Sequence, residues 1–143
     1  MRIEELLEDL FQDVPEIKRS VFMMLKAYHV SISDGRYPVW QYGVMECVEF
    51  LLEEANAYQH TLKKIFQFFE KMASAEEDTR EFFMCSVMDY FCERPNLIPT
   101  AKRFMGPFVA EAWTEYRRFD LDAQLFRLSQ LYSDEELEAM KQV

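Results

Sequence analysis

Three glutamates on one predicted helix face are the side chains whose types and spacing best suit chemistry. Glu46, Glu49 and Glu53 recur at intervals of three and four residues, and at about 100° per residue they share one side of a helix. Neighbouring carboxylates can bind a metal ion or act as general acid and base. A di-iron bundle also requires a histidine three residues after a glutamate. Neither His29 nor His60 has a glutamate three residues before it. We therefore expect no metal and no cofactor, and we interpret the glutamates as a solvated face.

The nucleophilic side chains carry no catalytic signature. The sequence contains neither the Gly-x-Ser-x-Gly motif of serine hydrolases nor a Gly-rich phosphate loop. Cys47, Cys85 and Cys92 form no Cys-x-x-Cys pair, and an odd count suits neither a disulfide framework nor a four-ligand zinc site. We expect a protein that is not an enzyme and that resides in a reducing cytoplasm.

The charge of the chain indicates the kind of partner it binds. The sequence has 26 Asp and Glu against 16 Lys and Arg, for a net charge of −10. Nucleic acids and anionic membranes are polyanions that attract basic clusters, so this balance disfavours both. We expect a basic protein partner.

One acidic group lies in the middle of a predicted helix, where helix-dipole effects at the first turn do not explain it. An aromatic residue points outward among these acids, opposite an apolar stripe, which resembles an interface anchor with a polar rim. The alternative is that the aromatic ring packs under a neighbouring helix or under the loop over 29–38. The predicted partner-binding residues are Glu46, Glu49, Phe50, Glu53 and Glu54.

Apolar residues at helical spacing predict the elements that carry this site. The pattern indicates an all-α chain, a compact single domain over residues 1–143 with about seven or eight helices. A turn signal at Asp34-Gly35 allows a short hairpin-like loop near residues 30–38. The expected helices run from residue 3 to near 13, 15–28, 38–56, 58–72, 75–93, a short one before Gly106, one from 107 to about 119, 121–132 and a last short one.

Two local sequence signals mark helix starts, whereas the patterns of a secretory signal peptide and of a membrane span are not found. Ser74 with Glu77, and Ser133 with Glu136, match the capping box. The N-terminal segment MRIEELLEDLF carries acids through its apolar stretch, unlike a secretory signal peptide. No run approaches the roughly 20 apolar residues that cross a bilayer.

The second half of the chain resembles a loose family of small bacterial helical proteins, some of them associated with toxin–immunity systems. The resemblance rests on KKIFQFFEKM (63–72), on the amphipathic helix over 81–93 and on FMGPFVAEAWTEY (104–116). It implies an inhibitor of a cognate toxin that binds in the bacterial cytoplasm. An acidic helical surface could then occupy the basic cleft of a nuclease toxin and exclude nucleic acid.

Two further functions remain open. Surplus aromatic residues could form a subunit contact in a homo-oligomeric or adaptor bundle. A small-ligand-binding protein could instead use a pocket lined by Trp40, Trp113 and Tyr116.

Overall fold

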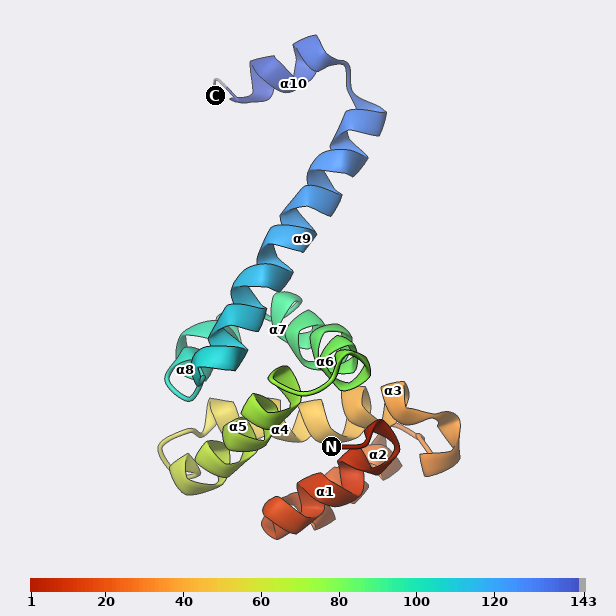
Figure 1. Cartoon of the computed structure of the whole chain (residues 1–143), viewed down its shortest axis with the longest axis vertical. Helices are drawn as coiled ribbons and strands as arrows, with labels where there is room; N and C mark the ends of the chain where they lie inside the picture. Colours follow the sequence, from red (N-terminus) through yellow and green to blue (C-terminus); the bar gives the residue numbers. More distant parts are fainter. Residues whose placement is uncertain (142–143) are drawn as a thin grey trace.

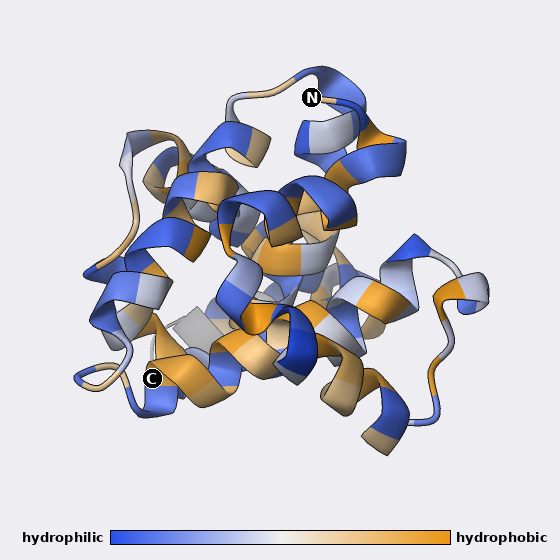
Figure 2. Ribbon diagram, turned by 90° about the horizontal axis from the view of Figure 1, so that it is seen from below, coloured by the Kyte–Doolittle hydropathy of each residue, from blue (hydrophilic) through white to orange (hydrophobic). Residues whose placement is uncertain are grey.

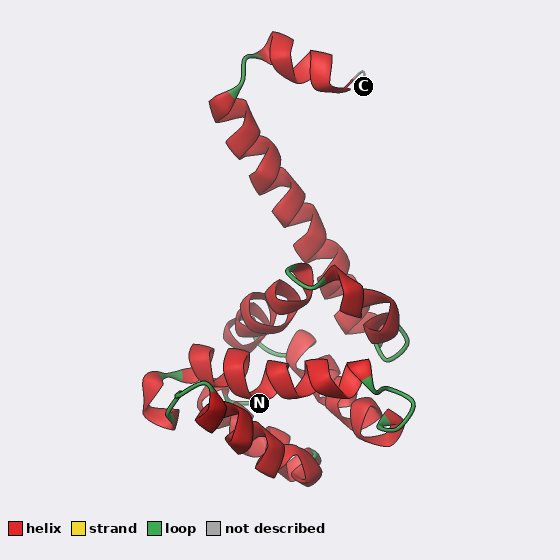
Figure 3. Ribbon diagram, turned by 180° about the vertical axis from the view of Figure 1, so that it is seen from behind, coloured by secondary structure: helices red, strands yellow, loops and turns green. Residues whose placement is uncertain are grey.

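The computed structural model describes residues 1–141 and contains helices joined by short loops (Figure 1). Apart from the short 3₁₀ turn Ile32–Asp34, eight continuous helical stretches follow one another along the described residues, and two of them contain π-helical turns. No strand occurs in this part of the chain (Figure 3). The elements are α1 (Leu6–Asp13), α2 (Lys18–Ala27), α3 (Arg36–Val39), α4 (Glu46–Glu53), α5 (Gln59–Ala73), α6 (Glu77–Phe83), α7 (Asp89–Cys92), α8 (Ile98–Lys102), α9 (Pro107–Leu131) and α10 (Asp134–Lys141). The prediction of an all-α bundle of seven or eight helices is confirmed.

An aromatic centre holds the bundle together. Phe66 of α5 lies 5.2 Å from Phe69 and 6.3 Å from Phe91, measured between ring centroids. Phe69 in turn lies 5.8 Å from Phe83 of α6. All four rings are buried, and tilted or offset ring pairs of this kind add about 0.5–1.5 kcal/mol each beyond area burial. In Figure 2 hydrophobic and hydrophilic segments alternate along the helices, as expected for amphipathic helices around a shared interior.

A π-helical turn, Trp40–Met45, joins α3 to α4. Within it Gly43 is buried, and a Cβ added there would lie 2.9 Å from Leu25 Cδ2 and 3.1 Å from Val21 Cγ1. Glycine therefore permits α2 to pack closely against this turn. A second π-helical turn, Met84–Met88, joins α6 to α7.

The start of α9 is capped by a side chain from another helix. Glu70 of α5 accepts hydrogen bonds from the backbone N–H groups of Phe108 (2.6 Å) and Val109 (3.0 Å). These N–H groups lack partners within their own helix, and a carboxylate also favours the positive end of the helix dipole. A Cβ on Gly106 would lie 2.5 Å from the Glu70 carboxyl carbon, so glycine is required for this approach.

Three predictions about local structure are wrong, and they concern the loop near 30–38, the cap at Ser74 and the end of α9. Residues 30–38 form no hairpin: a 3₁₀ turn, Ile32–Asp34, is closed by a capping box at Ser31 and leads directly into α3. Ser74 does not cap the next helix, because its hydroxyl donates to the Glu70 carbonyl at 2.9 Å, within its own helix. The helix beginning at Glu77 has Glu76 at its N-cap position.

The third correction concerns α9, which continues to Leu131 without the break expected near residue 120. Its first half faces the body, with Val109, Ala112 and Trp113 buried. Its second half runs away from the other helices, and α10 lies at its far end (Figures 1 and 3). The apolar spacing of this helix also predicts that Phe108 and Phe119 face inward, but they are 48% and 72% exposed. The capping box of Ser133 and Glu136 before α10 is confirmed, with the Glu136 N–H donating to the Ser133 hydroxyl at 3.2 Å.

Candidate functional site

The five predicted site residues all lie in or directly after α4, and the structure divides them into two groups. Glu46 and Glu49 face α7 and are only 15% and 23% exposed at their side chains. Phe50, Glu53 and Glu54 are exposed on the surface. The expected ring of solvated acids around Phe50 is therefore incomplete.

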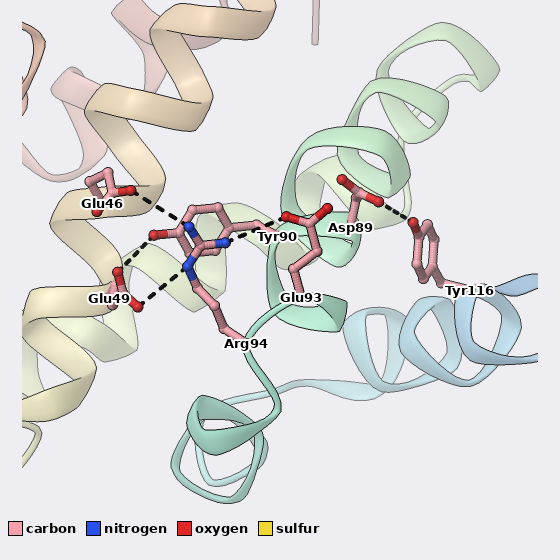
Figure 4. Close-up of polar contacts among 7 residues, drawn as sticks. All are labelled: Glu46, Glu49, Asp89, Tyr90, Glu93, Arg94 and Tyr116. Carbon is pink, nitrogen blue, oxygen red and sulfur yellow. Dashed lines mark hydrogen bonds and ion pairs between the residues drawn. The ribbon is translucent and has the colours of Figure 1, made fainter. Parts of the chain in front are cut away.

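Arg94, which directly follows α7 and its C-cap residue, accounts for the two inward glutamates (Figure 4). Its Nη2 lies 3.7 Å from Glu46 Oε1 and its Nε lies 3.4 Å from Glu49 Oε1. A third carboxylate, that of Glu93, lies 3.8 Å from its Nη1. The guanidinium also covers the ring of Tyr90, with 3.7 Å between its central carbon and the ring centroid. One cation thus joins α4 to the end of α7.

The Tyr90 hydroxyl completes this contact by donating a 2.9 Å hydrogen bond to Glu49 Oε2. Both oxygens of Glu49 are therefore engaged in contacts within the protein. The pKa of Tyr90 is raised, first by burial and then by this bond to Glu49. These contacts form a polar link between α4 and α7.

Burial raises the pKa of Glu46, and the negative charge of Glu49 raises it further, while Arg94 acts in the opposite direction. The charge of Glu46 in turn raises the pKa of the Tyr28 hydroxyl. Two half-buried carboxylates thus share one guanidinium, and both are directed toward the neighbouring segment of the chain.

A second polar link ties α7 to α9 (Figure 4). The Tyr116 hydroxyl donates to Asp89, and the pKa of Tyr116 is raised by burial and by this carboxylate. One turn further along α9, the Asp120 carboxylate lies 3.6 Å from the Cys92 thiol. These contacts fix the direction in which α9 leaves the body.

A surface groove lies on the other side of α4, and Phe50 forms part of its wall. We call it the Phe50 groove. It has a volume of about 250 Å³. Phe50 is 48% exposed, and its ring lies 6.1 Å from that of Tyr58, which follows α4 along the chain. The groove is lined by Glu16, Ile17, Ser20, Met23, Met24, Cys47, Phe50, Leu51, Tyr58 and Thr61.

The lining of the Phe50 groove is mostly apolar and comes from α2 with the 3₁₀ turn before it, from α4, and from α5 with the residue before it. Met23 is 61% exposed on α2, on the side away from the buried Val21 and Leu25. At the polar rim Glu16 pairs with Lys64 at 2.8 Å, and this hydrogen bond lowers the pKa of Glu16. Sequence reasoning missed Met23, Met24 and Tyr58 because they lie on other segments. Met23 lies outside the apolar stripe of its own helix, and this is the one feature of the sequence that indicated its exposure.

The cysteines show no activated thiol. Burial raises the pKa of Cys47 to about 11, so its thiol stays protonated at neutral pH. The pKa of the exposed Cys85 is also raised, by desolvation and then by the nearby Glu81 and Asp89. Among residues 1–141 no group of three or more His, Cys, Asp or Glu side chains could hold a metal ion. In the same residues no helix is long and apolar enough to cross a membrane.

Among the described residues, the cavity at Trp40 is not the pocket expected at the two tryptophans. Trp40 lines a shallow cavity of about 250 Å³ with Arg36 and residues of the N-terminal helix, and neither Trp113 nor Tyr116 takes part in it. Trp40 packs against Phe68 and Phe82 instead. This geometry gives the small-ligand alternative no support.

Comparison with family models, with curated proteins and with solved structures found no match for this chain.

Proposed function

We propose that this chain is a protein-binding domain that holds an apolar side chain of a basic partner in the Phe50 groove. The observation that carries the proposal is the groove itself, an apolar hollow walled by exposed Phe50, Tyr58 and Met23. Its volume, about 250 Å³, is below the roughly 300–1,000 Å³ of pockets for drug-sized ligands. A single side chain of a partner suits that space better than a whole small molecule.

The chemistry of the lining supports this occupant. Aromatic residues in a partly enclosed site are frequent binding hot spots, because they supply large contact area with few rotatable bonds. Methionines such as Met23 and Met24 adapt their shape to an incoming group. The exposed Glu53 and Glu54 lie at the end of α4, shortly after Phe50. There they would attract a basic protein.

The more specific form of the proposal is an immunity protein that neutralises a cognate toxin in the bacterial cytoplasm. The sequence resemblance and the net charge of −10 support it. A toxin that acts on nucleic acid presents a basic cleft, which an acidic protein can cover with fast, salt-dependent association. Three free thiols suit a reducing compartment.

The test is affinity capture from the source organism with the immobilised full chain. Phe50→Ala removes the aromatic wall, and Phe108→Ala is the matched control because both rings are 48% exposed. We expect one basic protein to be recovered by the wild type and by Phe108→Ala, and at least about tenfold less by Phe50→Ala. Equal recovery by all three chains would refute the site.

The immunity form needs a further measurement with the captured protein. Its gene is expressed alone, with the wild type, and with the Phe50→Ala variant, and growth is followed. We expect arrest alone, rescue by the wild type and weaker rescue by the variant. Normal growth without the wild-type chain would exclude a toxin and leave the protein-binding function to stand on the capture result.

A further inference from the structure

A surface hollow beside α5 has two cations in its lining and, among the described residues, no acid. Its volume is about 260 Å³, and we call it the Lys63 hollow. The Phe50 groove, the cavity at Trp40 and two hollows that border Arg80 each have at least one glutamate in their lining. In a chain of net charge −10, this local reversal of charge indicates a site for an anion. The Lys63 hollow is lined by Gln59, Lys63, Gln67, Arg103 and Phe104.

Lys63 differs from the two other lysines of α5 in having no acidic partner. Lys64 and Lys71 form ion pairs of 2.8 and 2.7 Å with acids at the junction of α1 and α2. Within residues 1–141 Lys63 takes part in no ion pair. At about 100° per residue it shares one face of α5 with Gln59 and Gln67. Its charge is therefore available to a ligand that enters the hollow.

The other wall of the Lys63 hollow is the turn between α8 and α9, which is held in place on both sides. Arg103 is the C-cap residue of α8, and its guanidinium carbon lies 5.6 Å from the centroid of the Phe104 ring. That ring lies 5.8 Å from the ring of the buried Phe66. Further along the chain, the cap from Glu70 fixes the start of α9. The two walls are therefore positioned by the core before any ligand binds.

The polar side chains of the hollow suit an anion with several acceptor oxygens. Lysine, arginine and the glutamine amides all donate N–H hydrogen bonds, and a guanidinium can bind two phosphate oxygens at once. Two cations that line one hollow also repel each other, and an anion between them removes that repulsion. A phosphoryl group offers three acceptor oxygens against two in a carboxylate, so it can engage more of these donors.

The size of the hollow and the charge of the chain limit the ligand to a small molecule. The volume is below the roughly 300–1,000 Å³ of pockets for drug-sized ligands. The net charge of −10 would repel an extended polyanion such as nucleic acid. A small anion responds mainly to charges within the screening length of about 8 Å at physiological salt. The partly exposed ring of Phe104 offers an apolar surface to the carbon atoms of such a ligand.

We propose that the Lys63 hollow binds a small phosphate monoester. The phosphoryl group accepts hydrogen bonds from Lys63 and Arg103, and the organic group lies against Phe104. This site is separate from the tryptophans at which a ligand pocket was expected. It shares no lining residue with the Phe50 groove, so the proposal does not depend on the proposed function.

The first test is an NMR titration of the full chain with phenyl phosphate, in a phosphate-free buffer whose ionic strength is held constant with sodium chloride. We expect saturable shifts of the amide signals at the hollow, with a Kd of about 1 mM or below. Lys63→Gln and Arg103→Gln should each weaken binding at least about tenfold. Lys26→Gln removes the same charge from an exposed position on α2 and should bind as the wild type does. No saturable shift up to about 20 mM, or the same affinity in all three variants, would overturn the proposal.

A comparison of anions tests the class of ligand. Inorganic phosphate and benzoate each carry one part of phenyl phosphate, and we expect both to bind at least about fivefold more weakly. Phe104→Leu should weaken binding of phenyl phosphate and leave that of inorganic phosphate unchanged, and circular dichroism checks that its helix content is retained. Benzoate that binds as tightly as phenyl phosphate would indicate a carboxylate site, and inorganic phosphate that does so would indicate the free ion as the ligand. Either result would contradict a site for a phosphate monoester.

Discussion

Arg94 lies over the ring of Tyr90, with 3.7 Å between the guanidinium carbon and the ring centroid, and from there reaches Glu46 and Glu49. The same cation therefore withdraws two of the five predicted binding residues from the surface. What remains outside is Phe50 with Glu53 and Glu54, beside a groove that the sequence did not indicate. α4 therefore has a polar side that contacts Arg94 and Tyr90 and an apolar side that lines the Phe50 groove.

Arg94→Ala should lower the free energy of unfolding by about 1–3 kcal/mol at pH 7, because it leaves Glu46 and Glu49 close together and half-buried without their cation. Urea denaturation followed by circular dichroism measures this change. The control is Arg127→Ala, which removes an exposed arginine from the second half of α9. Equal, small changes in both variants would show that the Arg94 contacts contribute nothing to stability.

Glu46 should make stability depend on pH in a defined window. Its pKa in the folded chain is raised above the ordinary value of 4.5, so between these two values the folded state binds more protons than the unfolded state. Its contribution to stability therefore decreases as pH rises through the window. In Glu46→Gln this dependence is absent, so the difference in unfolding free energy between variant and wild type should grow in the variant's favour with rising pH. Urea denaturation at several pH values from 4 to 7 measures it, and parallel curves would contradict the shift.

Substitutions of Glu70 and of Gly106 should have coupled effects on the free energy of unfolding. Glu70→Ala removes the cap from two N–H groups of α9 and should cost about 1–2 kcal/mol of stability. Gly106→Ala should also destabilise, because its Cβ would lie 2.5 Å from the Glu70 carboxyl carbon. In the double variant the second change should cost less than it does alone, since the carboxylate is already gone. A double-mutant cycle from urea denaturation measures the coupling, and strict additivity would contradict it.

Gly43→Ala should destabilise the chain by about 1–3 kcal/mol, because the added Cβ would lie 2.9 Å from Leu25 Cδ2. Leu25→Ala also costs stability by leaving a cavity, but it should make the glycine substitution tolerable. The Tm of the four chains measures this coupling. A Gly43→Ala variant as stable as the wild type would show that α2 can shift without cost.

The helices that bury one clear stripe were predictable from local pattern. The expected end near Asp13 matches α1, and the helix expected over 58–72 matches α5 within a residue or two. The capping box at Ser133 was correct, whereas the one at Ser74 was not, since its hydroxyl bonds to the carbonyl of Glu70. A serine at a helix end can satisfy either helix, and the sequence does not distinguish the two.

The site was only half predictable, for a physical reason. Helical phase directs Phe50 outward but left open that its ring packs under a neighbouring helix or under the loop over 29–38; the structure shows it 48% exposed. The partner of Glu46 and Glu49 is Arg94, which lies more than forty residues away and directly after the helix expected over 75–93, so no spacing rule could connect them. The continuity of α9 was missed because its second half has apolar residues on more than one side, which weakens the helical period.

Binding of a basic protein at the Phe50 groove is tested most directly by site-specific photo-crosslinking in the cells that naturally produce this chain. A photoreactive benzoylphenylalanine replaces Phe50 in one variant and the equally exposed Phe108 in another. We expect irradiation to yield one discrete adduct with a basic protein from position 50 and none from position 108. The same adducts from both positions, or none from position 50, would contradict binding at the Phe50 groove.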